Sequence, residues 1–215
     1  MSTDTKQVVT EEKPVEEKPV EEKPVEEKPA AKPAAKPAAK PAAKPAAKPV
    51  ELPAFEKSIS DKVVEKFGDK IQVEFVKENR VGIKVNREDV HDVAEFIRDG
   101  LNYDHVESVS GVDYPQDKEI EVVYHIGSYS DSSLAKQLLV LATRAQREEN
   151  PIPGKDATKL PTLRDIFYSV EFHEREVFEM FGVYFTGHPD NRRLLLPEDW
   201  ADLPPLRKDF AIKGR

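Results

Sequence analysis

Apolar residues in two early stretches of the chain recur every third or fourth position, which is the spacing of a helix with one buried face. The pattern predicts helices over 55–67 and 89–98. We expect the first helix to end at Gly68 and the second at Gly100, because glycine readily adopts the backbone conformation that closes a helix.

Strict alternation of apolar and polar residues predicts strands at 71–75, at 81–85 and, most clearly, at 120–126. The first two are separated by a short polar turn and are expected to form a hairpin. Residues 106–115 indicate a strand or an irregular segment. The next apolar stretch is ambiguous, and we favour a strand over 137–143 that pairs with the preceding one.

A loop rich in proline and glycine follows, and then the pattern predicts two short helices, at 163–168 and 171–181. This order of elements predicts an α+β fold over 53–183, in which a mixed or antiparallel sheet carries helices on one face. The remaining segment, 184–215, is interrupted by prolines yet carries large apolar and arginine side chains. We expect it to be an extended tail that lies on a partner subunit.

Residues 1–52 have the composition of a disordered tail. They repeat Glu-Glu-Lys-Pro-Val and then Ala-Lys-Pro-Ala, and they hold 9 of the 18 prolines. Such a segment has too little apolar area to offset the entropy of ordering it. Acidic residues gather in 11–28, whereas 30–50 holds five lysines and no acid. We expect a semi-rigid spacer or tether.

The rest of the chain is acidic, with 23 Lys and Arg against 32 Asp and Glu over 51–215, a net charge of −9. This balance disfavours nucleic-acid binding through general electrostatics. A nucleic-acid-associated protein that acts through the lysine-rich repeats is a second hypothesis. It is the less favoured one, because the glutamate-rich repeats would compete for the same lysines.

The chain has no cysteine, which excludes disulfides, thiolate chemistry, and zinc or iron–sulfur clusters held by cysteine. Its longest aliphatic run covers only 138–142, whereas a span of the bilayer takes roughly 20 apolar residues. No apolar segment of the signal-peptide kind is found at the N-terminus. We therefore expect the cytoplasm or the cytoplasmic face of a membrane.

The predicted helix at 171–181 mixes charged and large apolar residues. Helical geometry places Val177 and Phe181 on one face and Glu174 at its flank, whereas Arg175, Glu176 and Glu179 lie on the opposite side. A carboxylate beside an apolar stripe needs a partner, and Arg192 or Arg193 could supply one. The acid could serve an active site, but we favour a structural ion pair that fixes the tail.

Other candidate chemistry is weak. His173 and His188 lack the spacing of metal ligands, and His188-Pro189-Asp190 is expected to be a turn with local hydrogen bonds. Neither a glycine-rich phosphate loop nor a nucleophile elbow occurs in the sequence. No catalytic, cofactor-binding or metal residue is therefore expected. Residues 207–210 combine cations, an acid and an aromatic ring, which favours an interface anchor over an ordinary charged chain end.

The motifs of the last forty residues resemble the signature of the 30-kilodalton subunit of NADH-quinone oxidoreductase, which is respiratory complex I. The resemblance covers 55–215, and Pro204 stands where histidine is common in the family. The tail 1–52 has no counterpart in the family pattern. The signature residues, which the resemblance places at subunit interfaces, are Glu174, Arg175, Glu176, Glu179, Gly182, His188, Arg192, Arg193, Trp200, Arg207, Lys208 and Asp209.

The resemblance implies a non-catalytic scaffold in the peripheral arm of a proton-pumping enzyme, on the cytoplasmic side of the membrane. It implies that FMN, iron–sulfur clusters and quinone belong to other subunits. The implied partners are the large subunit that holds the quinone site and the subunit that holds the terminal iron–sulfur cluster. Related complexes accept electrons from NADH, ferredoxin, a deazaflavin or a hydrogenase, so the donor stays open at this point.

Overall fold

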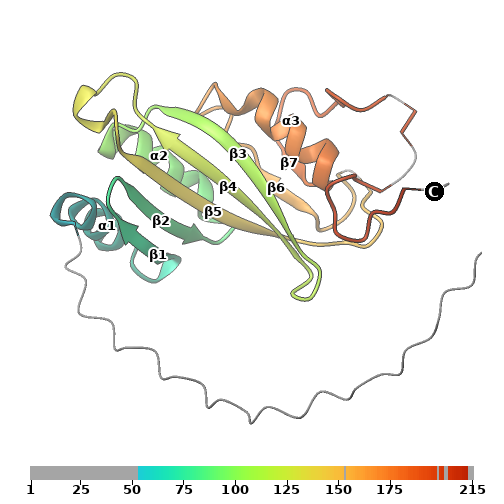
Figure 1. Ribbon diagram of the computed structural model, residues 1–215, viewed down its shortest axis with the longest axis horizontal. Coiled ribbons are helices and arrows are strands. Elements are labelled where there is room, and N and C mark those ends of the chain that lie inside the picture. Colours follow the sequence, from blue (N-terminus) through green and yellow to red (C-terminus); the bar gives the residue numbers. More distant parts are fainter. Residues whose placement is uncertain (1–52, 153, 198, 201–202, 213–215) are drawn as a thin grey trace, which may run out of the picture. The chain divides into compact units, whose positions relative to one another are not determined.

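The computed structural model describes residues 53–152, 154–197, 199–200 and 203–212, which fall within one compact unit. The expected tail 1–52 lies outside the described residues, as does Glu198. Figure 1 shows a central sheet with helices packed against it and an irregular C-terminal segment beside the last helix.

Five strands form the central sheet in the order β1-β2-β5-β4-β3. All neighbouring pairs are antiparallel except β2 with β5, which are parallel. The predicted hairpin and the predicted pairing of the strands at 120–126 and 137–143 are therefore confirmed, and the sheet is mixed. The strands are β1 (Ile71–Lys77), β2 (Arg80–Val85), β3 (His105–Tyr114), β4 (Glu119–Gly127) and β5 (Leu138–Gln146).

Three helices accompany the sheet: α1 (Ala54–Phe67), α2 (Val90–Leu101) and α3 (Val170–Phe181). Two short 3-10 turns, Gly68–Lys70 and Ser132–Leu134, follow α1 and precede β5. Helix α1 ends before Gly68 as predicted. Helix α2 continues past Gly100, because Leu101 is buried and Asn102, at φ +61°, closes the helix by donating its N–H to the carbonyl of Ile97.

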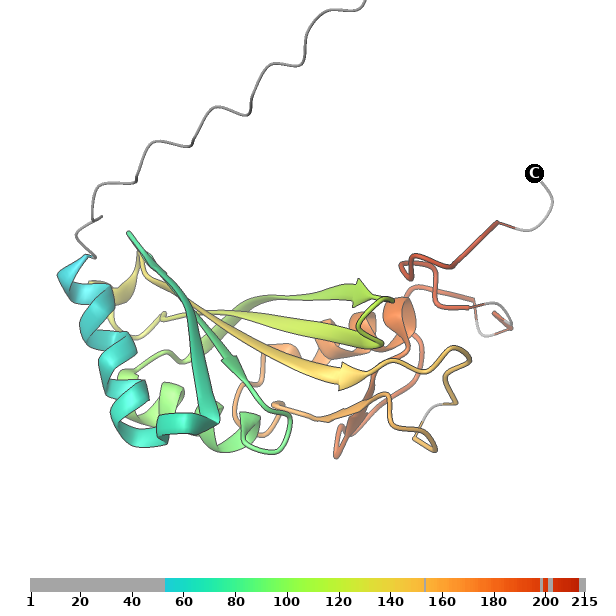
Figure 2. The same cartoon turned by 90° about the horizontal axis from the view of Figure 1, so that it is seen from below.

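One face of the sheet forms the core. Alternate residues of β4, from Ile120 through Tyr124 to Ile126, are at most 1 % exposed. The apolar residues of α2 and the buried side of α3 belong to the same cluster. Figure 2 shows these two helices on the same side of the sheet, as expected from the sequence.

The opposite face of the sheet carries charged side chains that pair with one another across the strands. Arg144 on β5 donates to Glu121 at 2.8 Å and to Glu119 at 2.6 Å on the neighbouring β4. Lys84 of β2 lies 3.5 Å from Glu121. Such cross-strand pairs stabilise this part of the sheet.

The predicted helix at 163–168 is wrong. The segment forms consecutive turns in which the carbonyl of Leu163 accepts from the N–H groups of Ile166 and Phe167. The N–H of Leu163 binds Glu174 and that of Arg164 binds Thr162, so side chains satisfy the first donors of the segment. The apolar side chains at 163, 166 and 167 are nevertheless buried, which explains the helical pattern in the sequence.

A second, two-stranded sheet lies next to α3 and was not predicted. Strand β6 (Lys159–Pro161) pairs in parallel with β7 (Tyr184–Thr186), and the ring of Phe185 is fully buried. The first residues of the expected tail therefore pack into the chain's own fold. They carry the following segment back along α3 (Figure 1).

Candidate subunit-docking surface

Glu174 of α3 is fully buried between the core sheet and the turns that follow β6. Its carboxylate accepts hydrogen bonds from the hydroxyl of Tyr124 at 3.2 Å, the hydroxyl of Thr162 at 2.5 Å and the N–H of Leu163 at 2.9 Å. The expected ion pair with Arg192 or Arg193 is wrong. Helical geometry points Glu174 into the core, where neutral donors take the place of an arginine.

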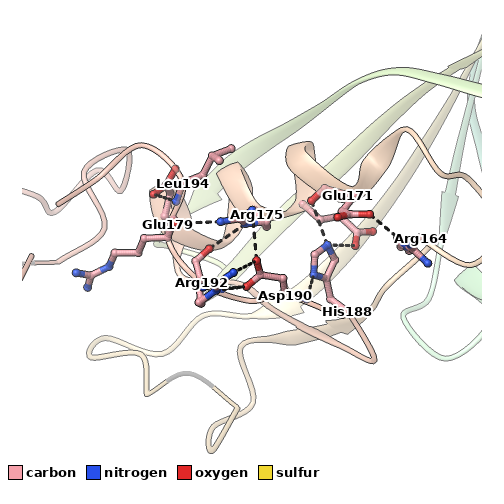
Figure 3. Close-up of polar contacts among 10 residues, drawn as sticks. Arg164, Glu171, Arg175, Glu179, His188, Asp190, Arg192 and Leu194 are labelled. Carbon is pink, nitrogen blue, oxygen red and sulfur yellow. Dashed lines mark hydrogen bonds and ion pairs between the residues drawn. The ribbon is translucent and has the colours of Figure 1, made fainter. Parts of the chain in front are cut away.

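Burial raises the pKa of Glu174 to about 7, even though the three hydrogen bonds act to lower it. His188 approaches this acid, with its Nε2 4.0 Å from the carboxylate and 3.0 Å from the carbonyl of Glu171 (Figure 3). The other ring nitrogen of His188 accepts from the N–H of Asp190 at 3.0 Å. The turn predicted at 188–190 is thus confirmed, and it fastens the segment after β7 to α3.

Residues 190–197 are called the signature loop. Two charged side chains on the polar side of α3 fix this loop to the helix. Glu179, only 4 % exposed, accepts from the N–H groups of Leu194, Leu195 and Leu196 at 2.9–3.0 Å. Arg175 donates in the opposite sense, to the carbonyls of Arg192 and Arg193 (Figure 3). The polar side of α3 therefore binds the chain's own backbone.

Arginines within the signature loop hold its shape. Arg192 forms a bidentate pair with Asp190, with both distances at 2.9 Å, and these bonds lower the pKa of Asp190 well below its usual range. Arg193 donates to the carbonyls of Pro197 at 3.1 Å and Trp200 at 2.7 Å. The indole of Trp200 lies 6.0 Å from the ring of Phe210, centroid to centroid.

Arg207, expected to anchor a partner, is instead buried in its own chain and is only 3 % exposed. It donates Nε to the carbonyl of Phe181 at 2.6 Å and Nη1 to the carbonyl of Glu148. Burial and the nearby Arg147 lower the pKa of Arg207. Its guanidinium satisfies a carbonyl at the end of α3, where cations are favoured.

The neighbouring segment is held by a buried acid that the sequence did not single out. Asp113 of β3 binds Arg147 at 2.6 and 3.3 Å and accepts from the N–H of Lys208 at 2.9 Å. Arg147 also binds Asp209 at 2.8 Å. The sequence Asp113-Tyr114-Pro115 indicates the end of a strand. It does not indicate that Asp113 binds a residue 95 positions further along the chain.

The described residues leave several large apolar side chains exposed around this framework. On one side of α3, Tyr168 is 75 % and Phe172 58 % exposed, and the guanidinium of Arg164 stacks over Tyr168 at 4.1 Å. Leu195 in the signature loop is 61 % and Leu206 56 % exposed. Large apolar side chains left exposed are typical of a contact with another protein, and aromatic rings and arginine are enriched in such contacts.

Among the described residues, no group of three or more His, Cys, Asp or Glu side chains is arranged to hold a metal ion. In the same part of the chain no helix has the length and apolar character needed to cross a membrane. The twelve predicted signature residues lie on α3, directly after it, or on the segments packed against it. Glu176 is exposed on the same helix.

Two relatives of the chain are named as subunits of oxidoreductases. It is 35% identical over 156 residues to a subunit of NADH-quinone oxidoreductase from Chlorobium phaeobacteroides, and the match covers 71% of this chain and 87% of the relative. It is also 35% identical over 131 residues to a subunit of F(420)H(2) dehydrogenase from Methanosarcina mazei. That match covers 61% of this chain and 75% of the relative.

A solved structure is similar as well. A chain of the membrane-bound sulfane sulfur reductase, an archaeal respiratory membrane complex, superposes with a TM-score of 0.57 at 26% identity. The superposition covers 73% of this chain and 86% of that chain. One protein family matches residues 83–215 of the chain. This range includes α2, β3 to β7, α3 and the signature residues. The chain belongs to the family of the respiratory-chain NADH dehydrogenase 30 Kd subunit.

Proposed function

We propose that the chain is a non-catalytic structural subunit in the peripheral arm of a proton-pumping NADH:quinone oxidoreductase. The observation that carries this proposal is the framework around α3. Glu179 and Arg175 fix the signature loop by its backbone, while Leu195 in the loop and Leu206 after it stay exposed. A loop held by its main chain presents its side chains at little further entropic cost on binding.

In this proposal the subunit carries no cofactor of its own. Its buried acids and arginines are engaged with each other and with backbone groups, so their role is to hold the surface. FMN, iron–sulfur clusters and quinone belong to other subunits in this proposal. The proposed partners are the quinone-site subunit and the subunit with the terminal iron–sulfur cluster. The chain itself would lie peripherally, on the cytoplasmic side of the membrane.

An electron donor other than NADH is a second candidate, and a specific observation favours considering it. Relatives named for NADH and for F(420)H(2) share the same 35% identity with this chain. Subunits similar to this chain therefore occur in enzymes that are named for different reductants. In either case the structural role proposed for this subunit is the same.

Purification from native membranes tests the proposal. The full chain would carry an N-terminal affinity tag, the membranes would be dissolved in mild detergent, and the bound proteins would be identified. We expect iron–sulfur and quinone-site subunits in stoichiometric amounts, with quinone reduction driven by NADH or by another reductant that names the donor. Recovery of the chain alone, or with nucleic acid, would contradict the proposal.

A further inference from the structure

The three hydrogen bonds that the buried carboxylate of Glu174 accepts all come from uncharged donors. One oxygen, Oε1, binds the hydroxyl of Tyr124 and the N–H of Leu163, whereas Oε2 binds the hydroxyl of Thr162 at 2.5 Å. An ion without a partner of opposite charge is costly to bury, so this arrangement favours the neutral, protonated acid. Glu174 is therefore a place where the fold can hold one proton.

The neighbouring ring of His188 is held in a neutral form that does not take this proton. Its Nε2 donates to the carbonyl of Glu171 at 3.0 Å (Figure 3). Its Nδ1 accepts from the N–H of Asp190 at 3.0 Å, which fixes the tautomer. A second proton on Nδ1 would face that N–H and break the bond. A proton taken up by this cluster therefore goes to Glu174.

The hydroxyl of Thr162 can serve both states of the acid. A hydroxyl donates one hydrogen bond and accepts two, and its hydrogen turns while the heavy atoms stay in place. When Glu174 is ionised, Thr162 donates to Oε2 and accepts from the N–H of Arg164 at 3.1 Å. When Glu174 is protonated, the acid donates to Thr162 instead, and the threonine hydrogen turns away. The same heavy-atom positions therefore fit both states.

Thr162 also lines a hollow on the surface. The hollow has a volume of about 350 Å³ and lies where α2, the turns after β6 and the segment after β7 meet. His91 of α2 and Asp165 of the turns are in its wall, 2.8 Å apart, and both side chains are exposed. A single hydroxyl thus lies between the buried acid and the solvent in this hollow.

The ionisable groups that face Glu174 also favour its protonated form. Burial is the main cause that raises the pKa of Glu174 to about 7, and the negative charge of Asp165 acts in the same direction. The cation of the same turns, Arg164, is engaged with another acid on α3, and His91 is paired with Asp165. Burial raises the pKa of Tyr124, on β4, well above its usual range, so this phenol stays a proton donor.

We propose that Glu174 is a proton-binding site that exchanges its proton with solvent in the hollow through the hydroxyl of Thr162. An acid in the solvent gives a proton to Oγ of Thr162 while the hydroxyl proton passes to Oε2 of Glu174. The hydroxyl is restored and the carboxylate becomes a neutral acid. The reverse steps release the proton.

This site is placed to control how firmly the chain closes over α3. The backbone N–H of Thr162 binds the carbonyl of Thr186 in β7, and His188 fastens the following residues to the helix. Loss of the proton as pH rises leaves a buried charge, which is relieved when the turns at 162–165 open and admit water. Since the fastened segment leads into the signature loop, pH sets how rigidly that loop is held. The inference concerns the chain alone and does not depend on the proposed function.

Carbon-13 NMR of the full chain, labelled at the glutamate carboxyl carbons, tests the site directly. The Glu174 signal is the one that disappears in Glu174→Gln. We expect its titration midpoint near pH 7, in place of the ordinary 4.5. A midpoint near 4.5 would mean that the fold does not hold the proton and would overturn the proposal.

The shape of the same signal at its midpoint tests the route. Rapid proton exchange gives one averaged signal, whereas slow exchange gives two. We expect one signal in the unaltered chain and in Thr162→Ser, which keeps a hydroxyl. We expect two signals in Thr162→Val, which has nearly the same shape but no hydroxyl. One averaged signal in Thr162→Val would overturn the route through Thr162.

Hydrogen exchange measures the consequence without a variant at Thr162, so it decides the proposal even if Thr162→Val does not fold. The reference is Glu174→Gln, whose amide mimics the neutral acid. Relative to it, the N–H of Leu163 in the unaltered chain should lose protection about tenfold between about pH 6 and pH 8. Glu176→Gln, at an exposed position of α3, should behave like the unaltered chain. Equal protection in the unaltered chain and Glu174→Gln at every pH would overturn the proposed control by the proton.

Discussion

Both oxygens of the Glu179 carboxylate accept the backbone N–H of Leu195, at 2.9 and 3.0 Å. The same carboxylate accepts from Leu194 and Leu196, so one side chain satisfies three consecutive donors. We expect Glu179→Ala to lower the local stability of this loop by about 2 kcal/mol, because hydrogen bonds to a charged group are lost. Faster hydrogen exchange of the three amides would measure the effect, whereas exchange in β4 should be unchanged.

Glu176 supplies a matched control for this substitution. It lies one turn earlier on the same helix but is exposed. Glu176→Ala changes the charge of α3 by the same amount without removing a contact to the signature loop. If both variants accelerated exchange at 194–196 equally, the effect would come from helix charge, and the role assigned to Glu179 would be wrong.

Local patterns were sufficient to predict most of the sheet and the three long helices. Strand β4 shows why, since its alternation of apolar and polar residues reflects a single buried face. The turn at 188–190 was also predictable, because its hydrogen bonds join residues two apart in the sequence. In each of these cases the decisive interactions join residues that are close in the sequence, or they repeat with the period of a strand or a helix.

The partners of the buried charges were not predictable in the same way. Glu174 meets Tyr124, 50 residues away, and Asp113 meets Lys208, 95 residues away. Arginines nearby in sequence were the obvious partners for Glu174, but the helix turns this acid towards the core. Sequence reasoning located the signature residues as a group. It did not show that many of them bind the chain's own backbone.

Gly182 at the end of α3 should tolerate no side chain. Its φ is +81°, and a Cβ atom would lie 2.9 Å from Pro151 and 3.0 Å from Nη2 of Arg207. We expect Gly182→Ala to lower the free energy of unfolding by more than the roughly 1–2 kcal/mol that left-handed backbone costs an ordinary residue. Denaturant unfolding of the full chain would measure it.

Gly187 helps to separate the backbone contribution from the contact. It also has a positive φ, +86°, but an added Cβ would meet only the methyl group of Thr162, at an ordinary contact distance of 3.4 Å. Gly187→Ala should therefore show the cost of a positive φ with little steric penalty. Equal effects at the two positions would mean that the contact with Arg207 and Pro151 carries no further penalty.

The pKa of Glu174 predicts a dependence of stability on pH. Because the pKa rises from 4.5 to about 7 on folding, the folded state binds the proton more tightly than the unfolded chain. The contribution of Glu174 to the free energy of unfolding is fully present below pH 4.5. It falls by at most about 3 kcal/mol as the pH rises towards 7. Glu174→Gln should flatten this part of the profile, measured by denaturant unfolding between about pH 4.5 and 8. An unchanged slope would contradict the assignment.

Asp113 and Asp209 test how burial sets the strength of an ion pair, because both bind the same guanidinium of Arg147. The side chain of Asp113 is 1 % exposed and that of Asp209 41 %. We expect Asp113→Asn to cost about 3 kcal/mol in denaturant unfolding, since a buried cation loses its acid. Asp209→Asn should cost less than about 1 kcal/mol.

The pair also has a pH signature. Burial by itself would raise the pKa of Asp113, but hydrogen bonds from Arg147 and from the N–H of Lys208 lower it overall. Its contribution is therefore present above pH 3.8 and is lost as pH falls through the folded pKa, so Asp113→Asn should lose stability less steeply in acid. Because Asp113 also binds the backbone of Lys208, the variant should speed hydrogen exchange at 207–209. If Asp209→Asn matched it in both measurements, the chain end would be held by surface charge instead of the buried acid.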